Sequence, residues 1–107
     1  LATCSRDKTV WVWEMADNDF ECVSVMHGHS QDVKAVVWHP NKELLVSASY
    51  DDTVRSWQDD GDDDWTCAQT LVGHSSTVWE AAFRPDHPRP YLVSCSEDLD
   101  VKVWRDE

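Results

Sequence analysis

Two sets of serine, histidine and aspartate are the residues of this sequence that could do chemistry together. One set is His29, Ser47 and Asp51, and a second set follows in the same order. A serine hydroxyl beside a histidine that a carboxylate orients is the arrangement found in serine hydrolases. The second set is His74, Ser94 and Asp98. A catalytic triad does not recur along one chain in this way, so the duplication favours a structural role and we expect no enzyme.

Two other features suggest ion binding but lack a complete set of ligands. His27 lies two residues before His29, yet the matching position further along is Val72 and no carboxylate cluster adjoins the pair. The acidic run at 59–64 lacks the spacing of a calcium-binding EF-hand loop. We therefore predict no metal and no cofactor. For this run two interpretations stay open: a solvated hairpin loop, or a docking site for a basic partner.

These residues belong to a unit that recurs about every 45 residues. A complete copy has a Gly-His pair, then Ser-x-Asp, then a closing tryptophan. The pairs are Gly28-His29 and Gly73-His74, the Ser-x-Asp turns are 5–7, 49–51 and 96–98, and the tryptophans are Trp13, Trp57 and Trp104. The pattern resembles the WD40 repeat. The resemblance implies an all-β fold, a WD40-type β-propeller fragment of about two and a half four-stranded antiparallel blades.

The alternation of apolar and polar residues predicts about ten strands, separated by turns rich in Pro, Asp, Asn and Gly. In the repeat register, residues 1–26 would end one blade, 33–71 would form a complete blade, and 78–105 would start the next. Trp38 and Trp79 fall on the innermost strands, where we expect packing into the core. The strands would position the serine, histidine and aspartate sets at equivalent places in successive blades.

By the WD40 resemblance, each repeat joins its histidine, a strand hydroxyl, the turn aspartate and the tryptophan into a buried hydrogen-bonded chain. Tryptophan only donates and aspartate only accepts, while serine and neutral histidine do both, so every polar group finds a partner. In the first copy the histidine would precede Leu1. The expected members are His29, Ser47, Asp51 and Trp57, then His74, Ser94, Asp98 and Trp104, and in the first copy Thr3, Asp7 and Trp13.

The charge balance limits the classes of partner. With 21 acidic and 9 basic residues the formal net charge is -12, which disfavours direct binding to nucleic acid or to anionic membranes. No apolar run approaches the roughly 20 residues of a membrane span. The four cysteines form no Cys-x-x-Cys motif, and we expect them to be small buried strand residues in a reducing compartment.

Several strings go beyond what a propeller requires. They lie at 4–14, 21–25, 30–34, 37–40, 49–55, 63–65 and 76–79. Together they closely resemble the WD-repeat protein of the cytosolic iron–sulfur protein assembly (CIA) targeting complex. The resemblance implies a seven-bladed parent, of which this chain would be roughly the third to fifth blades. It also implies a non-enzymatic adaptor that helps recognise and mature cytosolic and nuclear apo iron–sulfur proteins.

The resemblance further implies partners and a location. The partners would be proteins: a MIP18-type subunit, a large HEAT-repeat subunit and apo iron–sulfur client proteins. The location would be the cytoplasm, and also the nucleus. The alternative is a WD-repeat scaffold of another complex, such as a ubiquitin-ligase substrate receptor.

Arg6 is the candidate partner-binding residue. It lies in the turn between the second and third strands of its blade, within a string that matches the resembled family in full. Tyr50 and Glu97 stand at its position in the other copies, so the fold does not require arginine there. The alternative is an arginine that only forms a surface salt bridge, an interaction that contributes about 0–1 kcal/mol.

Overall fold

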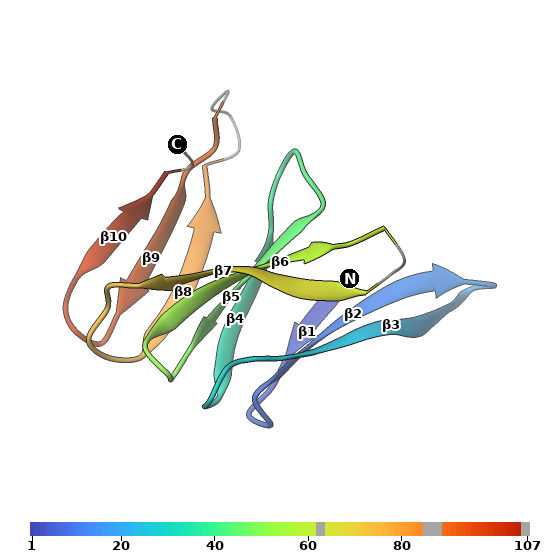
Figure 1. Cartoon of the computed structure of the whole chain (residues 1–107), viewed down its shortest axis with the longest axis horizontal. Coiled ribbons are helices and arrows are strands. Elements are labelled where there is room, and N and C mark those ends of the chain that lie inside the picture. Colours follow the sequence, from blue (N-terminus) through green and yellow to red (C-terminus); the bar gives the residue numbers. More distant parts are fainter. Residues whose placement is uncertain (62–63, 85–88, 106–107) are drawn as a thin grey trace.

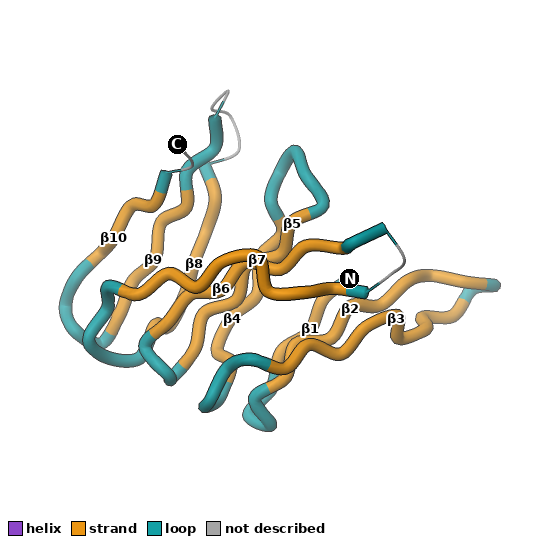
Figure 2. The backbone as a smooth tube through the Cα atoms, in the orientation of Figure 1, coloured by secondary structure: helices purple, strands orange, loops and turns teal. Residues whose placement is uncertain are grey.

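The computed structural model describes residues 1–61, 64–84 and 89–105. Within these ranges the chain forms three antiparallel sheets and no helix, and therefore no helix that could cross a membrane (Figures 1 and 2). The strands are β1 (Ala2–Cys4), β2 (Thr9–Ala16), β3 (Asp19–His27), β4 (Val33–Trp38), β5 (Leu44–Ser49), β6 (Thr53–Asp59), β7 (Trp65–Val72), β8 (Val78–Phe83), β9 (Leu92–Ser96) and β10 (Val101–Trp104). The predicted all-β propeller fragment is confirmed.

Each sheet is a meander in which strands that follow one another along the chain are also neighbours. The orders are β1-β2-β3, β4-β5-β6-β7 and β8-β9-β10. Irregularities in the pairing recur at equivalent places, before Trp13 in β2 and before Trp57 in β6. Such bulges increase the local twist of a strand. The three sheets therefore repeat one backbone design, as the sequence period predicts.

The sheets stack face to face, and the middle sheet is covered on both faces (Figure 1). On one side its Val33, Leu45 and Trp57 pack against Val10 and Met26 of the first sheet. Side chains that alternate with these face the last sheet and form a second cluster. That cluster contains Ala35, Val46, Ala48 and Val54 from the middle sheet and Val78, Ala81 and Leu92 from the last sheet. Covering on both faces explains why nearly every residue of β5 is buried.

Two expectations about burial are wrong. Trp38 and Trp79 are not fully packed in the core, because they stand near the ends of the innermost strands β4 and β8, and both side chains remain partly exposed. The four cysteines are free, and only Cys4 is even partly buried. Cys22 and Cys67 lie on the edge strands β3 and β7, Cys95 lies on β9, and all three are exposed.

The outer face of the last sheet carries apolar side chains. Trp104 packs toward the middle sheet, so Val101 and Val103, which alternate with it along β10, face the other way and are exposed. An exposed apolar face and an unpaired strand edge both favour association.

We therefore expect the isolated chain to self-associate as its concentration rises. Replacing both Val101 and Val103 with lysine should shift sedimentation velocity profiles toward the monomer. Val72→Lys is the matched control, since Val72 is exposed on the middle sheet and its change should have no such effect. A wild-type chain that remains a monomer and unfolds cooperatively at all concentrations would contradict this expectation.

Candidate functional site

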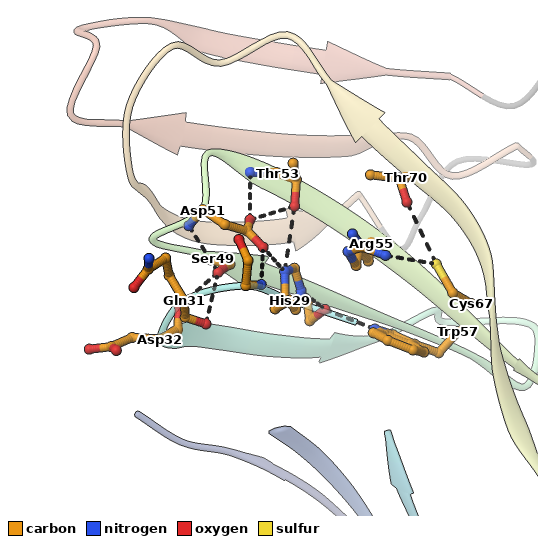
Figure 3. A network of polar contacts seen from close by, with 12 residues as sticks. His29, Gln31, Asp32, Ser49, Asp51, Thr53, Arg55, Trp57, Cys67 and Thr70 are labelled. Carbon is orange, nitrogen blue, oxygen red and sulfur yellow. Dashed lines mark hydrogen bonds and ion pairs between the residues drawn. The ribbon is translucent and has the colours of Figure 1, made fainter. Parts of the chain in front are cut away.

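A chain of hydrogen bonds crosses the middle sheet and ends at a carboxylate (Figure 3). The indole N–H of Trp57 on β6 donates to the Ser47 hydroxyl on β5 at 2.8 Å. That hydroxyl lies 2.6 Å from Nε2 of His29, and Nδ1 of His29 lies 2.8 Å from Oδ2 of Asp51. With neutral His29 donating from Nδ1, each polar group in the chain is satisfied.

Asp51 connects this chain to the backbone on two sides. Its Oδ2 accepts the Ser30 N–H at 3.0 Å, just before β4 begins. Its Oδ1 accepts the Thr53 N–H at 3.0 Å and also the Thr53 hydroxyl, at the start of β6. One carboxylate therefore joins the connection that enters the sheet to the turn between β5 and β6.

Burial and hydrogen bonding set the ionisation of this pair. Burial lowers the pKa of His29 and outweighs the opposing effect of the Asp51 carboxylate, so the imidazole is neutral near pH 7. For Asp51, burial alone would raise the pKa, but the hydrogen bonds from Thr53, His29 and Ser30 outweigh it and hold the pKa below its ordinary value. The result is a neutral histidine beside a charged carboxylate.

The last sheet repeats the same arrangement. Trp104 donates to Ser94 at 2.9 Å, Ser94 lies 2.8 Å from Nε2 of His74, and Nδ1 of His74 lies 3.0 Å from Asp98. Burial would raise the pKa of Asp98, yet the N–H groups of Ser75 and Asp100 and the bonds from side chains hold it well below its ordinary value.

The first sheet brings together only part of its predicted set. Trp13 donates to the Thr3 hydroxyl at 3.0 Å. Asp7 instead bonds within its own turn, where its Oδ1 accepts the Thr9 N–H at 3.0 Å and the Thr9 hydroxyl. The bonds from Thr9 hold the pKa of Asp7 below its usual range. The turn thus keeps its aspartate hydrogen bonds without a histidine.

These sets cannot serve as catalytic triads. Ser47 is fully buried and Ser94 nearly so, and each hydroxyl is held between an indole N–H and a histidine. A catalytic serine must be accessible, so that its hydroxyl can reach a bound substrate. Nor do the described residues include a group of three or more His, Cys, Asp or Glu side chains that could hold a metal ion.

The glycine of each Gly-His pair has a packing role that the sequence pattern alone did not explain. A Cβ added at Gly28 would lie 2.9 Å from the Trp57 ring, and one at Gly73 would lie 3.0 Å from the Trp104 ring. Real Cβ atoms do not approach a ring so closely, because the atoms would overlap. Glycine therefore lets the connection lie against the tryptophan that begins the hydrogen-bonded chain.

Arg6 lies in the turn between β1 and β2, at the edge of the sheets where all such turns gather (Figure 1). Its side chain is 94% exposed, and its Nε is 3.8 Å from Oδ2 of Asp32. Lys34 approaches the same carboxylate oxygen at 3.6 Å. Other side chains at this edge, from Tyr50, Trp79 and Glu97, were not recognised as candidates from the sequence.

The other acidic and loop features lie partly outside the described residues. In the acidic run 59–64, residues 62–63 are not described, and Gly61 donates its N–H to Asp59 at 3.0 Å. Residues 85–88, between β8 and β9, are also not described.

Comparison with known proteins agrees with the repeated geometry. The profile of the family described as WD domain, G-beta repeat, matches residues 20–58 and 65–105. The chain belongs to the WD40 repeat family.

Among its relatives, this WD40 chain is 56% identical over 81 residues to a protein of Ixodes scapularis named probable cytosolic iron-sulfur protein assembly protein CIAO1 homolog, covering 76% of the chain and 25% of that protein. It is 38% identical over 139 residues to probable cytosolic iron-sulfur protein assembly protein 1 of Neurospora crassa. This match covers 97% of the chain and 30% of that protein. It is 33% identical over 116 residues to nucleoporin SEH1 of Xenopus tropicalis. This match covers 97% of the chain and 32% of that protein. The chain thus spans about a third or less of these relatives.

We expect removal of one member of the hydrogen-bonded chain to destabilise the propeller that contains it. Asp51→Ala leaves His29 and the Ser30 N–H without an acceptor, which should lower the free energy of unfolding by about 1–3 kcal/mol. Glu43→Ala, at an exposed carboxylate, is the control and should have little effect. Denaturant unfolding of the full-length protein measures both, and equal effects of the two changes would contradict the assignment.

The pKa of His29 also predicts a dependence on pH. Because this pKa is lower in the folded state than in the unfolded state, the unfolded chain takes up a proton first as pH falls. The stability that neutral His29 contributes is complete above its unfolded pKa of about 6.5 and is lost as pH falls toward its folded pKa.

The stability difference between wild type and His29→Gln should therefore narrow between about pH 7 and pH 5. The difference between wild type and Gln58→Ala, at an exposed residue without a titratable group, should stay nearly constant. Unfolding curves at several pH values test this, and a His29→Gln difference that widens on acidification would refute it.

Proposed function

We propose that the chain is part of a non-enzymatic adaptor of the cytosolic iron–sulfur protein assembly machinery. The observation that carries the proposal is the similarity, over 97% of the chain, to a protein named for that assembly. The second relative named for it is 56% identical over 81 residues. In this proposal the adaptor helps recognise and mature cytosolic and nuclear apo iron–sulfur proteins.

The three sheets would be successive blades, incomplete at 1–26 and 78–105 and complete at 33–71. They would correspond to the third to fifth blades of a seven-bladed parent. An adaptor needs a rigid scaffold with outward-facing side chains, and the paired buried hydrogen-bonded chains supply rigidity. The serines and histidines that could act in catalysis are used within the fold, which supports a binding role.

The partners of the parent would be a MIP18-type subunit, a HEAT-repeat subunit and apo iron–sulfur client proteins, in the cytoplasm and also in the nucleus. The iron–sulfur cluster is the cargo of the client, and the chain itself would hold no cofactor. With a formal charge of -12, binding to nucleic acid or to a membrane surface is disfavoured.

Arg6 would contact a partner or client. Its guanidinium is almost fully exposed, and its ion pair with Asp32 is long, at 3.8 Å. An exposed guanidinium on an acidic protein offers two parallel donors to a carboxylate, a geometry that lysine does not reproduce. Because Tyr50 and Glu97 occupy the same place in the other turns, the backbone forms without arginine.

We expect Arg6→Glu in the full-length parent to leave the thermal midpoint nearly unchanged and to weaken maturation of iron–sulfur clients. Loss of an exposed surface residue costs little stability, whereas reversing the charge repels a carboxylate. Lys42→Glu is the matched control, since it makes the same charge change at the opposite edge of the sheets. Enzymatic activity of a client in cells that carry each variant is the measurement.

If the Arg6→Glu protein unfolded, or if the client kept full activity with it, the assignment of Arg6 to the contact surface would be wrong.

The broader proposal is tested by purifying the wild-type parent and identifying the proteins that co-purify with it. Recovery of cullin adaptors without any iron–sulfur assembly subunit would favour the alternative, a ubiquitin-ligase substrate receptor.

A further inference from the structure

The first sheet lies at one end of the stack, so neither of the other sheets covers its outer face (Figure 1). Val10 and Met26 pack toward the middle sheet, and the residues that alternate with them along β2 and β3 therefore point the other way. Residues paired across neighbouring strands share a face. We call this outer face the head face. Its pairs are Trp11 with Val25, Trp13 with Cys22, and Met15 with Phe20.

The head face is apolar. Met15 is 56% exposed and Phe20 is 46% exposed, and the rings of Trp11 and Trp13 stack with their centres 5.4 Å apart. The carboxylates of the two strands alternate with these residues and lie on the reverse of the sheet; they are Glu14, Asp19 and Glu21.

The charged or titratable groups near the head face lie at its margin. The N-terminal ammonium donates to the Trp13 carbonyl, within the plane of the sheet. His27 pairs with Thr9 at the end of β3, and Asp17 lies in the turn beyond β2. Groups at a margin remain in water when the centre of a face is covered, so none of them opposes apolar contact there.

The last sheet ends the stack on the other side and also has an uncovered face (Figure 1). Because Ala81, Leu92 and Trp104 pack toward the middle sheet, the residues that alternate with them face outward. We call this outward side the tail face. Its two rows are Glu80, Cys95 and Val101, then Ala82, Val93 and Val103.

The chain already makes the matching contact twice. Between successive sheets, the tail side of the earlier sheet packs on the head side of the later one. Val101 of the tail face matches Val54, which is fully buried in the cluster shared with the last sheet. Phe20 of the head face matches Trp65, which is buried in the cluster shared with the first sheet. The two uncovered faces are therefore the two halves of one contact.

We propose that the tail face of one copy of this chain docks on the head face of a second copy. The contact removes exposed apolar side chains from water, as it does between successive sheets. The two faces differ, so the contact is heterologous, and copies add until the arc closes into a ring or extends as a filament. This inference concerns the 107-residue chain itself and does not depend on the proposed function.

Glu80 is the one charged side chain within the rows of the tail face. It lies on β8, which matches β4 of the middle sheet, where Ala35 stands at the same position. The order β1-β2-β3 gives the first sheet no strand at that place, because β1 matches β5 and β9. In the docked pair the Glu80 carboxylate therefore lies beside the covered rows and keeps its water.

Two double variants each block one face. Met15→Lys with Phe20→Lys blocks the head face, and Val101→Lys with Val103→Lys blocks the tail face. All four side chains are exposed, so the sheet-on-sheet contacts within a copy stay intact. By sedimentation velocity, each variant alone should be a monomer. An equimolar mixture should form a complex of two copies and nothing larger, because the intact tail of one variant meets the intact head of the other.

Val72→Lys with Leu99→Lys is the charge-matched control. It adds the same two positive charges at exposed apolar side chains outside both faces. Lys8 already occupies the position of Leu99 in the first turn, with nearly the same φ. This control should self-associate as the wild type does, and loss of its association would show that charge alone governs the effect.

Salt provides a second test. Copies with a formal charge of -12 repel one another, so screening by added salt should strengthen association through apolar faces. Wild-type association that weakens as salt rises would mean that opposite charges hold the copies together, and it would overturn the proposal.

The remaining outcomes identify the contact. A head-blocked variant that associates alone uses tail-to-tail contacts, and a tail-blocked variant that associates alone uses head-to-head contacts; either result overturns the proposal. So does a mixture that stays monomeric, or one that grows beyond two copies, while circular dichroism shows both variants folded. If a double variant loses its strand signal, the single changes Phe20→Lys and Val101→Lys replace the doubles in the same mixing test.

Discussion

The hydrogen-bonded carboxylate in the β1–β2, β5–β6 and β9–β10 turns is the interaction on which the structure depends. Asp51 shows its full form. It holds its own turn through the Thr53 N–H and holds the connection from the preceding sheet through His29 and the Ser30 N–H. The first sheet separates these two roles. There Asp7 has no histidine, and it still accepts the Thr9 N–H. The carboxylate therefore forms the turn, and the histidine ties successive sheets together.

That carboxylate also forces an unusual backbone on the residue after it. Lys8, Asp52 and Leu99 all have positive φ, at 76°, 74° and 72°. Side chains other than Gly, Asn and Asp rarely adopt this region, because the Cβ crowds the backbone. A lysine and a leucine nevertheless adopt the same φ here as the aspartate. The hydrogen bonds of the turn thus fix the backbone whatever side chain occupies it.

A backbone fixed by a few constant residues leaves neighbouring side chains free to differ. Arg6, Tyr50 and Glu97 occupy one position of three superimposable turns and have unrelated chemistry. The backbone contacts of two of them are equivalent: the Tyr50 N–H donates to the Asp32 carbonyl and the Glu97 N–H donates to the Thr77 carbonyl. Constant residues that fix the turn and variable residues available for recognition are therefore separated at the level of single positions along the same edge.

This separation explains what the sequence could and could not predict. The strands, the sheet order and the members of the hydrogen-bonded chains follow from the repeat, because residues such as Asp51 and Asp98 recur with their spacing. The exposure of individual side chains did not follow from the repeat. Trp79 and Cys67 have strand-like neighbours, yet one faces solvent on an innermost strand and the other lies on an edge strand. Alternation gives two faces without saying which of them a neighbouring sheet covers.

The contacts of Lys34 with the Tyr50 and Trp79 rings could not be predicted from the sequence for a related reason. Lys34, Tyr50 and Trp79 are far apart along the chain and meet only because consecutive sheets stack with their turns at one edge. A signal was nevertheless present in the sequence, since these positions change chemistry between copies while their neighbours stay constant. In a repeat protein, positions that vary within a fixed backbone are where selection for binding can act without a cost to the fold. Comparing the copies with one another therefore identifies candidate contact residues from one chain alone.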